Sequence, residues 1–234
     1  MTAAEFKSQF LILYDKVANL SAPPYEDSEI ETFLNMAQLE FVKSHYNYKK
    51  NKEKEGTEET ENRRKELVSL VRYSTLSPST SQSGVFPNGV VFDLPTELMY
   101  TLTENAVIAS DDDCIDGNVV EIKPITHDEY NAYIKNPFKK PDSSLIWRLD
   151  FGYKSSKIKH ELITGDDYTI TTYNLRYLKI PNKIQLPSGT ILGITSELNP
   201  IVHDAIVNIA VRMATAVTKP EAYQVAATEQ QISE

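Results

Sequence analysis

The side chains in this sequence that are best suited to chemistry are four histidines, and their spacing indicates no catalytic or metal site. They stand at His45, His127, His160 and His203, without the H-x-x-x-H or H-E-x-x-H spacing that brings two ligands to one helix face. Zinc needs three or four converging ligands, which these positions and the single cysteine do not supply locally. The sequence also lacks the G-x-S-x-G, P-loop and G-x-G-x-x-G motifs. We therefore expect packing or surface histidines, no cofactor and no enzymatic activity.

A run of aspartates is the best candidate for an ion site. Its carboxylates are Asp111, Asp112, Asp113 and Asp116. Asp112 and Asp116 imitate alternate ligands of a calcium loop, but Cys114 between them is a poor calcium ligand. Lys123 stands where the loop should supply a bidentate glutamate. Because Asp and Gly also favour hairpin turns, the preferred interpretation is a structural turn, with a metal site as the weaker alternative.

A sugar-binding surface is a further possibility. The chain has 13 tyrosines and one tryptophan, Trp147, and aromatic rings can line a carbohydrate site. Aromatic residues are, however, favoured in strands for reasons of packing alone. No pair of carboxylates is singled out for glycoside hydrolysis, since their separation is set by the fold. The residues alone therefore indicate a protein that is not an enzyme, without naming its task.

Composition indicates a folded protein of ordinary type. The 234 residues are 41% hydrophobic and 24% charged, enough to bury a core without disulfides. A single cysteine excludes an internal disulfide, and neither an export signal nor an apolar run near 18 residues is evident. We therefore expect a protein that is intracellular or part of something assembled inside a cell, with no membrane partner. A net charge of −9 disfavours general affinity for the phosphate backbone.

Helices are predicted at both ends of the chain. The first covers residues 3–20, with Thr2 and Glu5 at capping-box spacing, and the second begins at Ser28 with a box closed by Glu31. Residues 49–62 form a charged stretch of Lys and Glu that we expect to be a flexible extension. A short third helix is predicted at residues 63–73.

The C-terminal helix, residues 196–217, carries two apolar seams. The first seam consists of Leu198, Val202, Ala205, Ile209, Met213 and Ala216, and the second of Val207, Ala210, Val211 and Ala214. An apolar arc this wide indicates a helix that is central in its subunit, shared with a neighbour, or both. Pro220 is expected to end this helix. Thr218 and Glu221 have capping-box spacing, so a further helix can begin there, and its larger apolar residues are Tyr223, Val225 and Ile232.

Between the helices the periodicity changes from 3.6 to 2 residues. The predicted strands are 90–92, 99–108, 119–125, 145–153, 160–163 and 168–180, with a short helix at 127–135 capped by Thr126 and Glu129. Residues 74–89 read as a connector. The predicted fold class is α+β: terminal helices that form a helical bundle, with a β-rich insertion. As one composite domain this gives residues 1–80 for the N-terminal helices, 85–194 for the insertion, and 195–234 for the C-terminal helix and arm.

Several segments together resemble a known family. The opening APPYEDSEIETFLNMAQLEFVKSHYN, the middle segments PITHDEYNAYIKNPFKKP, SLIWRLD and TTYNLRYLKIPNKIQL, and the closing ELNPIVHDAIVNIAVRMATA and KPEAYQ are similar to head-to-tail connector (adaptor or ring) proteins of short-tailed, crAss-like bacteriophages. The similarity covers nearly the whole chain except residues 49–61. It is a similarity of order and texture, with no catalytic signature.

The resemblance implies a structural virion protein of the neck or tail, made in the host cytoplasm. Such adaptors form a ring, typically a dodecamer, that binds the portal, extends the DNA channel and presents a platform to the next tail ring or tail component. Genomic DNA passes through without sequence-specific binding, as an acidic balance would favour. In such a ring we expect Val207, Val211 and Ala214 at the subunit interface, and Tyr223, Val225 and Ile232 in an arm that docks on a partner. The alternatives are a later tail ring or hub subunit and a carbohydrate-binding tail module.

Overall fold

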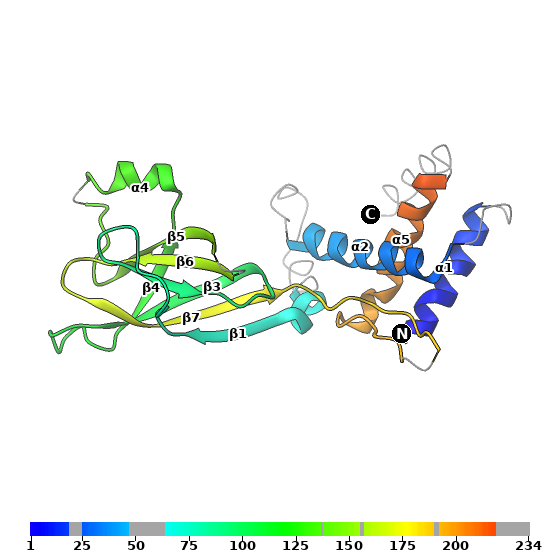
Figure 1. Cartoon of the computed structure of the whole chain (residues 1–234), viewed down its shortest axis with the longest axis horizontal. Helices are drawn as coiled ribbons and strands as arrows, with labels where there is room; N and C mark the ends of the chain where they lie inside the picture. The colour runs from blue at the N-terminus through cyan, green and yellow to red at the C-terminus, as the bar shows by residue number, and fades with distance from the viewer. Residues whose placement is uncertain (19–24, 47–63, 137, 155–156, 190–191, 219–234) are drawn as a thin grey trace. The chain divides into compact units, whose positions relative to one another are not determined.

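The chain divides into two compact units, one rich in helices and one built on a sheet (Figure 1). The computed structural model describes residues 1–18, 25–46, 64–136, 138–154, 157–189 and 192–218. The first unit contains residues 1–70 and 180–234, and the second contains residues 71–179. Helices together with a mixed sheet confirm the α+β class. The second unit begins and ends about fifteen residues earlier than the β-rich segment expected from sequence, residues 85–194.

Three long helices make the core of the first unit. They are α1 (Ala3–Ala18), α2 (Asp27–Tyr46) and α5 (His203–Thr218), the last preceded by the short 3-10 helix η3 (Pro200–Val202). Helix α5 packs against both α1 and α2. The buried side chains between them include Phe6, Phe10, Tyr14, Ile30, Leu34, Phe41, Ile206, Val207 and Ala210. The apolar stripes read from the sequence therefore face one another, and their burial is the main source of stability in this unit.

The first helix begins where its capping residues predict. The backbone N–H of Thr2 donates to Glu5 Oε2 at 2.8 Å, and the N–H of Glu5 donates to Thr2 Oγ1 at 3.3 Å. Each side chain thus satisfies a backbone donor that the first helical turn leaves unpaired. The predicted box at Thr2 and Glu5 is confirmed.

The second helix begins earlier than predicted, and its capping box at Ser28 and Glu31 is wrong. The helix starts at Asp27, and the N–H of Glu26 donates to Glu29 Oε2 at 2.8 Å. Glu31 Oε1 instead accepts a hydrogen bond from the N–H of Leu186 at 2.6 Å. A buried backbone donor 155 residues away therefore uses the carboxylate that local spacing assigned to the cap.

The predicted third helix ends sooner than residue 73. Residues 64–67 are helical, Val68–Leu70 is the 3-10 helix η2, and Val71–Leu76 is strand β1. Strand β1 pairs antiparallel with β7, with Val71 opposite Leu178 and Leu76 opposite Tyr173. The expected connector at residues 74–89 therefore starts three residues too early, because long-range pairing overrides the local preference.

Seven strands form one mixed sheet in the second unit. Besides β1 they are β2 (Gly89–Asp93), β3 (Leu98–Ala109), β4 (Val119–Pro124), β5 (Leu145–Lys154), β6 (Lys157–Ile163) and β7 (Thr169–Lys179). Their order across the sheet is β1-β7-β3-β4-β5-β6-β2. All neighbouring pairs are antiparallel except β4 and β5, which are parallel. The parallel pair requires a crossover, and helix α4 (His127–Tyr133) lies within that crossover.

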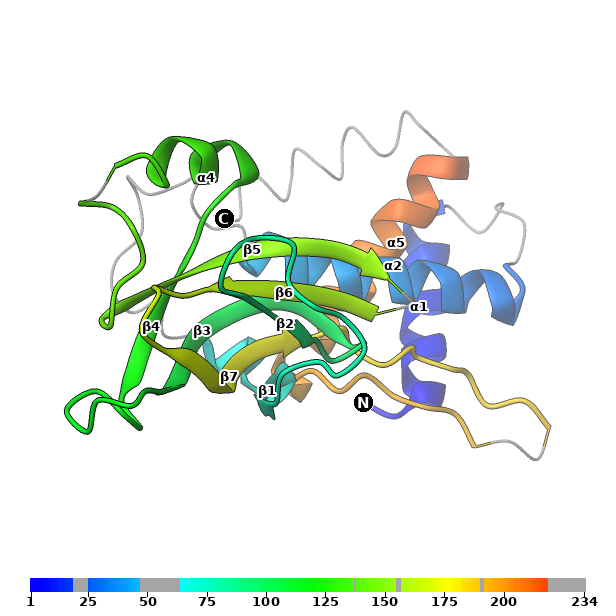
Figure 2. The same ribbon diagram turned by 60° about the vertical axis from the view of Figure 1, so that its left-hand side comes forward.

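The sheet curls so that strands distant in its order meet (Figure 2). Phe92 on edge strand β2 lies 5.4 Å from Tyr173 on β7, measured between ring centroids. The main core lies inside the curl and includes Phe92, Ala106, Ile122, Ile146, Leu162, Tyr173 and Leu175. A smaller cluster, Ile125, Tyr130, Trp147, Leu149 and Ile163, packs α4 against the opposite face. Strand β5 thus buries residues on both faces.

The capping box predicted for helix α4, at Thr126 and Glu129, is confirmed. The side chain of Thr126 accepts from the N–H of Glu129, whose carboxylate accepts from the N–H of Thr126. These bonds lower the pKa of Glu129, the backbone bond of Thr126 being the largest cause. The helix places Tyr130 against Trp147, with ring centroids 6.0 Å apart and nearly perpendicular. Local capping and an aromatic anchor therefore hold α4 on the sheet.

Candidate functional site

The four histidines are held by separate elements, and two of them, His127 and His160, approach a common residue, Asp150. His45 stacks on Phe41, with ring centroids 3.9 Å apart, and lies 3.2 Å from Glu66. His203 is 2% exposed and its Nε2 lies 3.0 Å from the carbonyl oxygen of Leu198, while burial lowers its pKa. Among the residues that the structure describes, no three His, Cys, Asp or Glu side chains are grouped as metal ligands.

The aspartate run forms the exposed turn between β3 and β4, and two of its carboxylates hold that turn. Asp112 Oδ1 accepts from the N–H of Cys114 at 2.9 Å, and Asp116 Oδ1 accepts from the N–H of Ser110 at 3.1 Å. Gly117 has a φ of 74°, a conformation that glycine adopts without steric cost. Asp111 and Asp113 are also exposed. This geometry supports the interpretation as a structural turn.

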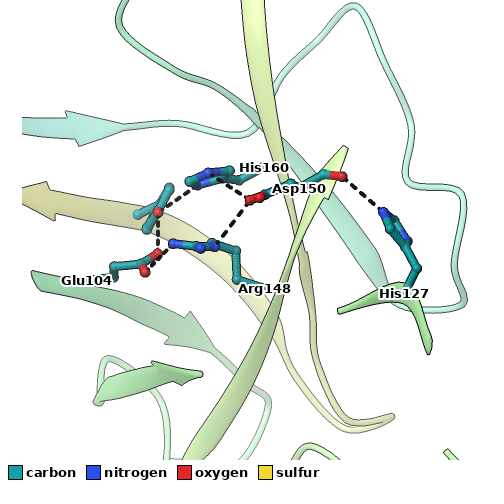
Figure 3. A network of polar contacts seen from close by, with 6 residues as sticks. Glu104, His127, Arg148, Asp150 and His160 are labelled. Atoms are coloured by element: carbon teal, nitrogen blue, oxygen red, sulfur yellow. Dashed lines mark hydrogen bonds and ion pairs between the residues drawn. The ribbon is translucent and has the colours of Figure 1, made fainter. Parts of the chain in front are cut away.

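A cluster of polar side chains lies inside the curl of the sheet, and no motif in the sequence predicts it (Figure 3). The cluster consists of Glu104 on β3, Arg148 and Asp150 on β5, His160 on β6 and Tyr173 on β7. The Tyr173 hydroxyl donates to Glu104 Oε2 at 2.6 Å, and His160 Nδ1 lies 3.0 Å from the same hydroxyl. Arg148 pairs with the other oxygen of Glu104.

Burial controls the charges in this cluster. The side chains of Glu104, Arg148 and His160 are 8%, 14% and 6% exposed. Desolvation, with the nearby charge of Arg148, lowers the pKa of His160 to about 3. Desolvation and the charge of Glu104 raise the pKa of Tyr173. At neutral pH, His160 and Tyr173 are therefore neutral, and Glu104 and Arg148 form the buried ion pair.

The cluster is suited to holding strands together. The polar atoms of Glu104 and Tyr173 bond to partners within the cluster, and Asp150 reaches His160 Nε2 at 3.3 Å from its exposed position. His127 reaches only the backbone carbonyl of Asp150, at 3.2 Å. A neutral imidazole with a pKa near 3 is a poor general base at neutral pH. The cluster therefore stabilises the curled sheet.

The residues expected at a subunit interface lie inside the subunit. Val207, Val211 and Ala214 are 0%, 5% and 0% exposed, because α1 and α2 cover that seam. Side chains buried in this way have almost no surface left for a neighbouring subunit. On the other seam, Ala205, Ile209, Met213 and Ala216 retain partial exposure. The expected docking residues Tyr223, Val225 and Ile232 lie outside the described residues.

Helix α5 is long and apolar enough to meet a simple criterion for crossing a membrane. Residues Pro200–Val217 have a mean hydropathy of 1.2. Within this stretch Ile206, Val207 and Ala210 are buried in α5, which packs against α1 and α2, whereas Ile201 and Val217 are 79% and 71% exposed. This pattern is that of a core helix in a folded unit.

The tryptophan proposed for a sugar site is not available to a ligand. Trp147 is 1% exposed and is packed beneath Tyr130 and Tyr133 of α4. Tyr173 and Tyr177 are also buried. These three aromatic side chains therefore serve the core, as strand propensity alone would explain.

Large apolar side chains remain exposed on both units. In the first unit they include Ile12, Met36, Val68, Leu192, Ile201 and Val217, and in the second Tyr73, Val85, Leu102, Val119 and Phe138. Phe138, in the loop after α4, is 96% exposed. Single exposed apolar residues are common, but side chains this large and this exposed also occur where a protein meets partners.

Comparison with known proteins identifies the family. The family model described as "Phage tail ring protein 3/4" matches residues 1–226. "Ring protein 4/5" of Bacteroides phage crAss001 is 28% identical over 231 residues, covering 92% of this chain and 93% of that protein. "Ring protein 3" of the same phage is 31% identical over 227 residues, covering 92% and 95%. The resemblance to ring proteins of crAss-like phages is therefore confirmed: the chain belongs to the phage tail ring protein 3/4 family and is a structural component of the virion tail.

Proposed function

We propose that this protein forms a homo-oligomeric ring, a dodecamer, in the neck of the virion, where it joins the portal to the tail and extends the DNA channel. Its partners are further copies of itself, the portal protein and the next tail ring. The observation that carries this proposal is the family match over residues 1–226, together with two ring proteins that align over more than nine-tenths of their own lengths. Similarity of that extent supports a shared way of assembling.

The charge of the chain supports passage of DNA without retention. With 33 acidic and 24 basic side chains, the net charge is −9. A surface with this balance repels phosphate groups on average, so a channel built from such subunits favours sliding over binding. The exposed apolar side chains supply material for contacts between subunits and with adjacent rings.

Assembly and position are tested separately. Mass photometry of the purified protein, alone and with portal-bearing heads, should give a species of about twelve subunit masses. Labelling the protein and imaging the particle neck should then place that ring directly below the portal. A protein that stays monomeric with and without heads would contradict the ring.

A later tail ring or hub subunit is the second candidate, and membership of a family of tail ring proteins favours it as much as a position directly below the portal. The same image distinguishes the two, because a later ring would lie further from the portal with another protein between them. A carbohydrate-binding tail module is the third candidate. The burial of Trp147 removes its main support.

A further inference from the structure

The two edge strands of the sheet, β1 and β2, are protected differently. On one side β2 pairs with β6, and on its other side it meets residues 78–88, which we call the strap. Pro78 forms an antiparallel bridge with Phe92, and the N–H of Ser79 donates to the carbonyl oxygen of Val91 at 2.7 Å. The outer edge of β2 is therefore covered by a segment of its own chain.

The strap uses the backbone groups of β2 that point away from β6. The N–H of Leu94, directly after β2, donates to the carbonyl of Ile158 at 3.0 Å, so this residue faces β6. Successive residues of a strand direct their backbone groups to opposite sides, so Gly89 and Val91 face outward. Val91 is bonded to the strap as described, and the N–H of Gly89 donates to the carbonyl of Phe86 at 3.0 Å. Groups that a further strand would need are therefore already occupied.

Two buried charged side chains of β6 hold the strap in place. Glu161 is 1% exposed, and its Oε1 accepts from the N–H groups of Val85 and Phe86 at 2.6 Å and 2.9 Å. Lys159 is 3% exposed, and its Nζ donates to Ser81 Oγ at 3.4 Å. Hydrogen bonds to charged groups are stronger than those between neutral groups. The strap is thus fixed at several points by polar contacts.

The opposite edge of the sheet, β1, has no such cover among the described strands. Strand β1 pairs with β7 over six residues without a bulge. It contains neither lysine nor proline, two residue types that commonly protect an edge, and Val71, Tyr73 and Thr75 are of types favoured in strands. Arg72 Nη1 donates to the carbonyl of Val71 at 2.9 Å, which covers one acceptor at the start of the strand. The rest of this edge is suited to pairing with another extended strand.

We propose that the strap is an autoinhibitory contact, which keeps the outer edge of β2 from pairing with strand β1 of a second copy. The two strands have six and five residues, so they match in length. While the strap is in place only one edge of each sheet is open, and sheets of different copies do not join head to tail. Release of the strap opens the second edge, and β1 of one copy then continues the sheet of the next. The strap lies within the second unit and acts on the free subunit, so its role does not depend on the proposed ring.

A glycine in the strap provides the means of release. A Cβ added at Gly84 would lie 2.1 Å from the carbonyl oxygen of Gly89, so Gly84→Ala must move the strap away from the start of β2. The probe is a fluorescent peptide with the sequence of residues 71–76. Its anisotropy should show binding to Gly84→Ala at least about tenfold tighter than to the wild type. A peptide with Tyr73→Pro and Ser74→Pro should bind neither protein, because one of the two lost N–H groups faces β2.

A second variant releases the strap in another way. Ser79→Pro removes the N–H that donates to Val91 and should give the same gain in peptide binding. Ser83→Ala is the matched control, since Ser83 is exposed and adjacent to Gly84, and it should bind the peptide like the wild type. Folding of each variant is checked by the fluorescence of Trp147, which lies in the same unit. Two strap variants that both unfold this unit would show that the strap cannot be released, which overturns the proposal.

Amide hydrogen exchange reports directly on the strap. The N–H groups of Val85 and Phe86 should exchange faster in the strap variants than in the wild type, while those between β5 and β6 keep their protection. Folded variants with a released strap but no gain in peptide binding overturn the proposal. Equal binding of the peptide to the wild type also overturns it, because the peptide would then lie on the open edge of β1.

Self-association identifies the occupant of the opened edge. In mass photometry, Gly84→Ala should form larger species at concentrations where the wild type does not. Thr75→Lys, at an exposed position of β1, should reverse this gain, because a lysine on an edge strand opposes further pairing. A gain that survives Thr75→Lys would assign the edge of β2 to an occupant other than β1 and overturn the proposal.

Discussion

Tyr173 on β7 donates a hydrogen bond of 2.6 Å to Glu104 on β3, and the same carboxylate pairs with Arg148 on β5. One buried negative charge therefore connects three strands of the curled sheet. Its partners come from positions 44 and 69 residues away in sequence. A buried ion pair of this kind adds little net stability relative to a well-packed apolar core, but removing one partner is costly.

Replacing Glu104 by Gln should therefore destabilise the second unit strongly. The substitution leaves Arg148, whose side chain is 14% exposed, with only the exposed carboxylate of Asp150, 3.6 Å from its Nε, as a counter-charge. We expect the free energy of unfolding to fall by about 3 kcal/mol or more. Urea unfolding followed by tryptophan fluorescence measures this change, since Trp147 lies in the same unit. A loss below about 1 kcal/mol would contradict the importance of the pair.

Tyr173→Phe should cost less, because the ion pair survives. The hydroxyl lost is the one that Glu104 and His160 share, and we expect a decrease of about 1–3 kcal/mol in the free energy of unfolding. Tyr73→Phe is the matched control on neighbouring strand β1. Its hydroxyl also bonds a side chain, Asn174, but Tyr73 is 61% exposed. The control should change stability by less than about 0.5 kcal/mol.

The contrast between local and distant contacts explains which features the sequence could predict. Alternation of apolar residues predicted most strands, and a capping box predicted helix α4. The box is local, because Thr126 and Glu129 are three residues apart and bond to each other's backbone. Spacing failed for Glu31, whose carboxylate binds Leu186 across 155 residues. Spacing also does not predict that Arg148 is buried, because that follows from the curl of the sheet. Contacts set by sheet curvature leave no periodic mark in the sequence.

Stability should decrease in acid because of His160. The pKa of this histidine is about 3 in the folded protein, against an ordinary value of 6.5. Between these values the unfolded chain binds a proton that the folded chain does not, so the stabilisation is complete above about pH 6.5 and is lost as pH falls towards 3. We expect a slope of about 1 kcal/mol per pH unit between about pH 6 and 4.

His160→Asn isolates that slope from the titration of carboxylates. Asn retains a polar atom near the Tyr173 hydroxyl but does not titrate, so unfolding free energies of the variant should depend less steeply on pH over the same range. His127→Asn is the control, since His127 is exposed and contacts only a backbone carbonyl in the cluster. Equal slopes for the wild type and His160→Asn would show that His160 does not control acid stability.

Removal of metal should not affect the fold. Asp112 and Asp116 already accept backbone hydrogen bonds in the turn, which closes the loop without an ion. The melting temperature with EDTA should therefore agree with that in calcium or zinc to within about 1 °C, and metal analysis of the purified protein should find less than one ion per chain. A stoichiometric ion whose removal lowers the melting temperature by several degrees would contradict the interpretation as a structural turn.

Val207→Lys with Val211→Lys should unfold the first unit, because both valines are packed against neighbouring helices. Burying each valine contributes about 1.5–3 kcal/mol, and a lysine at these positions would add the cost of an unpaired buried charge. Circular dichroism and size exclusion should show loss of helix and aggregation. Ile201→Lys is the control close to the same helix, since Ile201 is 79% exposed, and it should stay folded. A folded double variant that fails to form rings would restore this seam to the subunit interface.

Removal of residues 219–234 should separate folding from docking. Helix α5 ends at Thr218, and its last turns are fixed by contacts within the first unit: Tyr25 donates to the carbonyl of Ala214 at 3.0 Å, and Thr215 is 2% exposed. Truncation after Thr218 leaves these contacts in place, so the melting temperature should change by less than about 2 °C.

The removed segment carries Tyr223, Val225 and Ile232 as its larger apolar residues, too few to hold a helix in water without a partner. If the segment binds the portal, truncated protein should attach to portal-bearing heads at least about tenfold more weakly in a sedimentation assay, and a triple Ser variant of these three residues should match it. Full attachment by the truncated protein would reduce the segment to a terminal tail with no docking role.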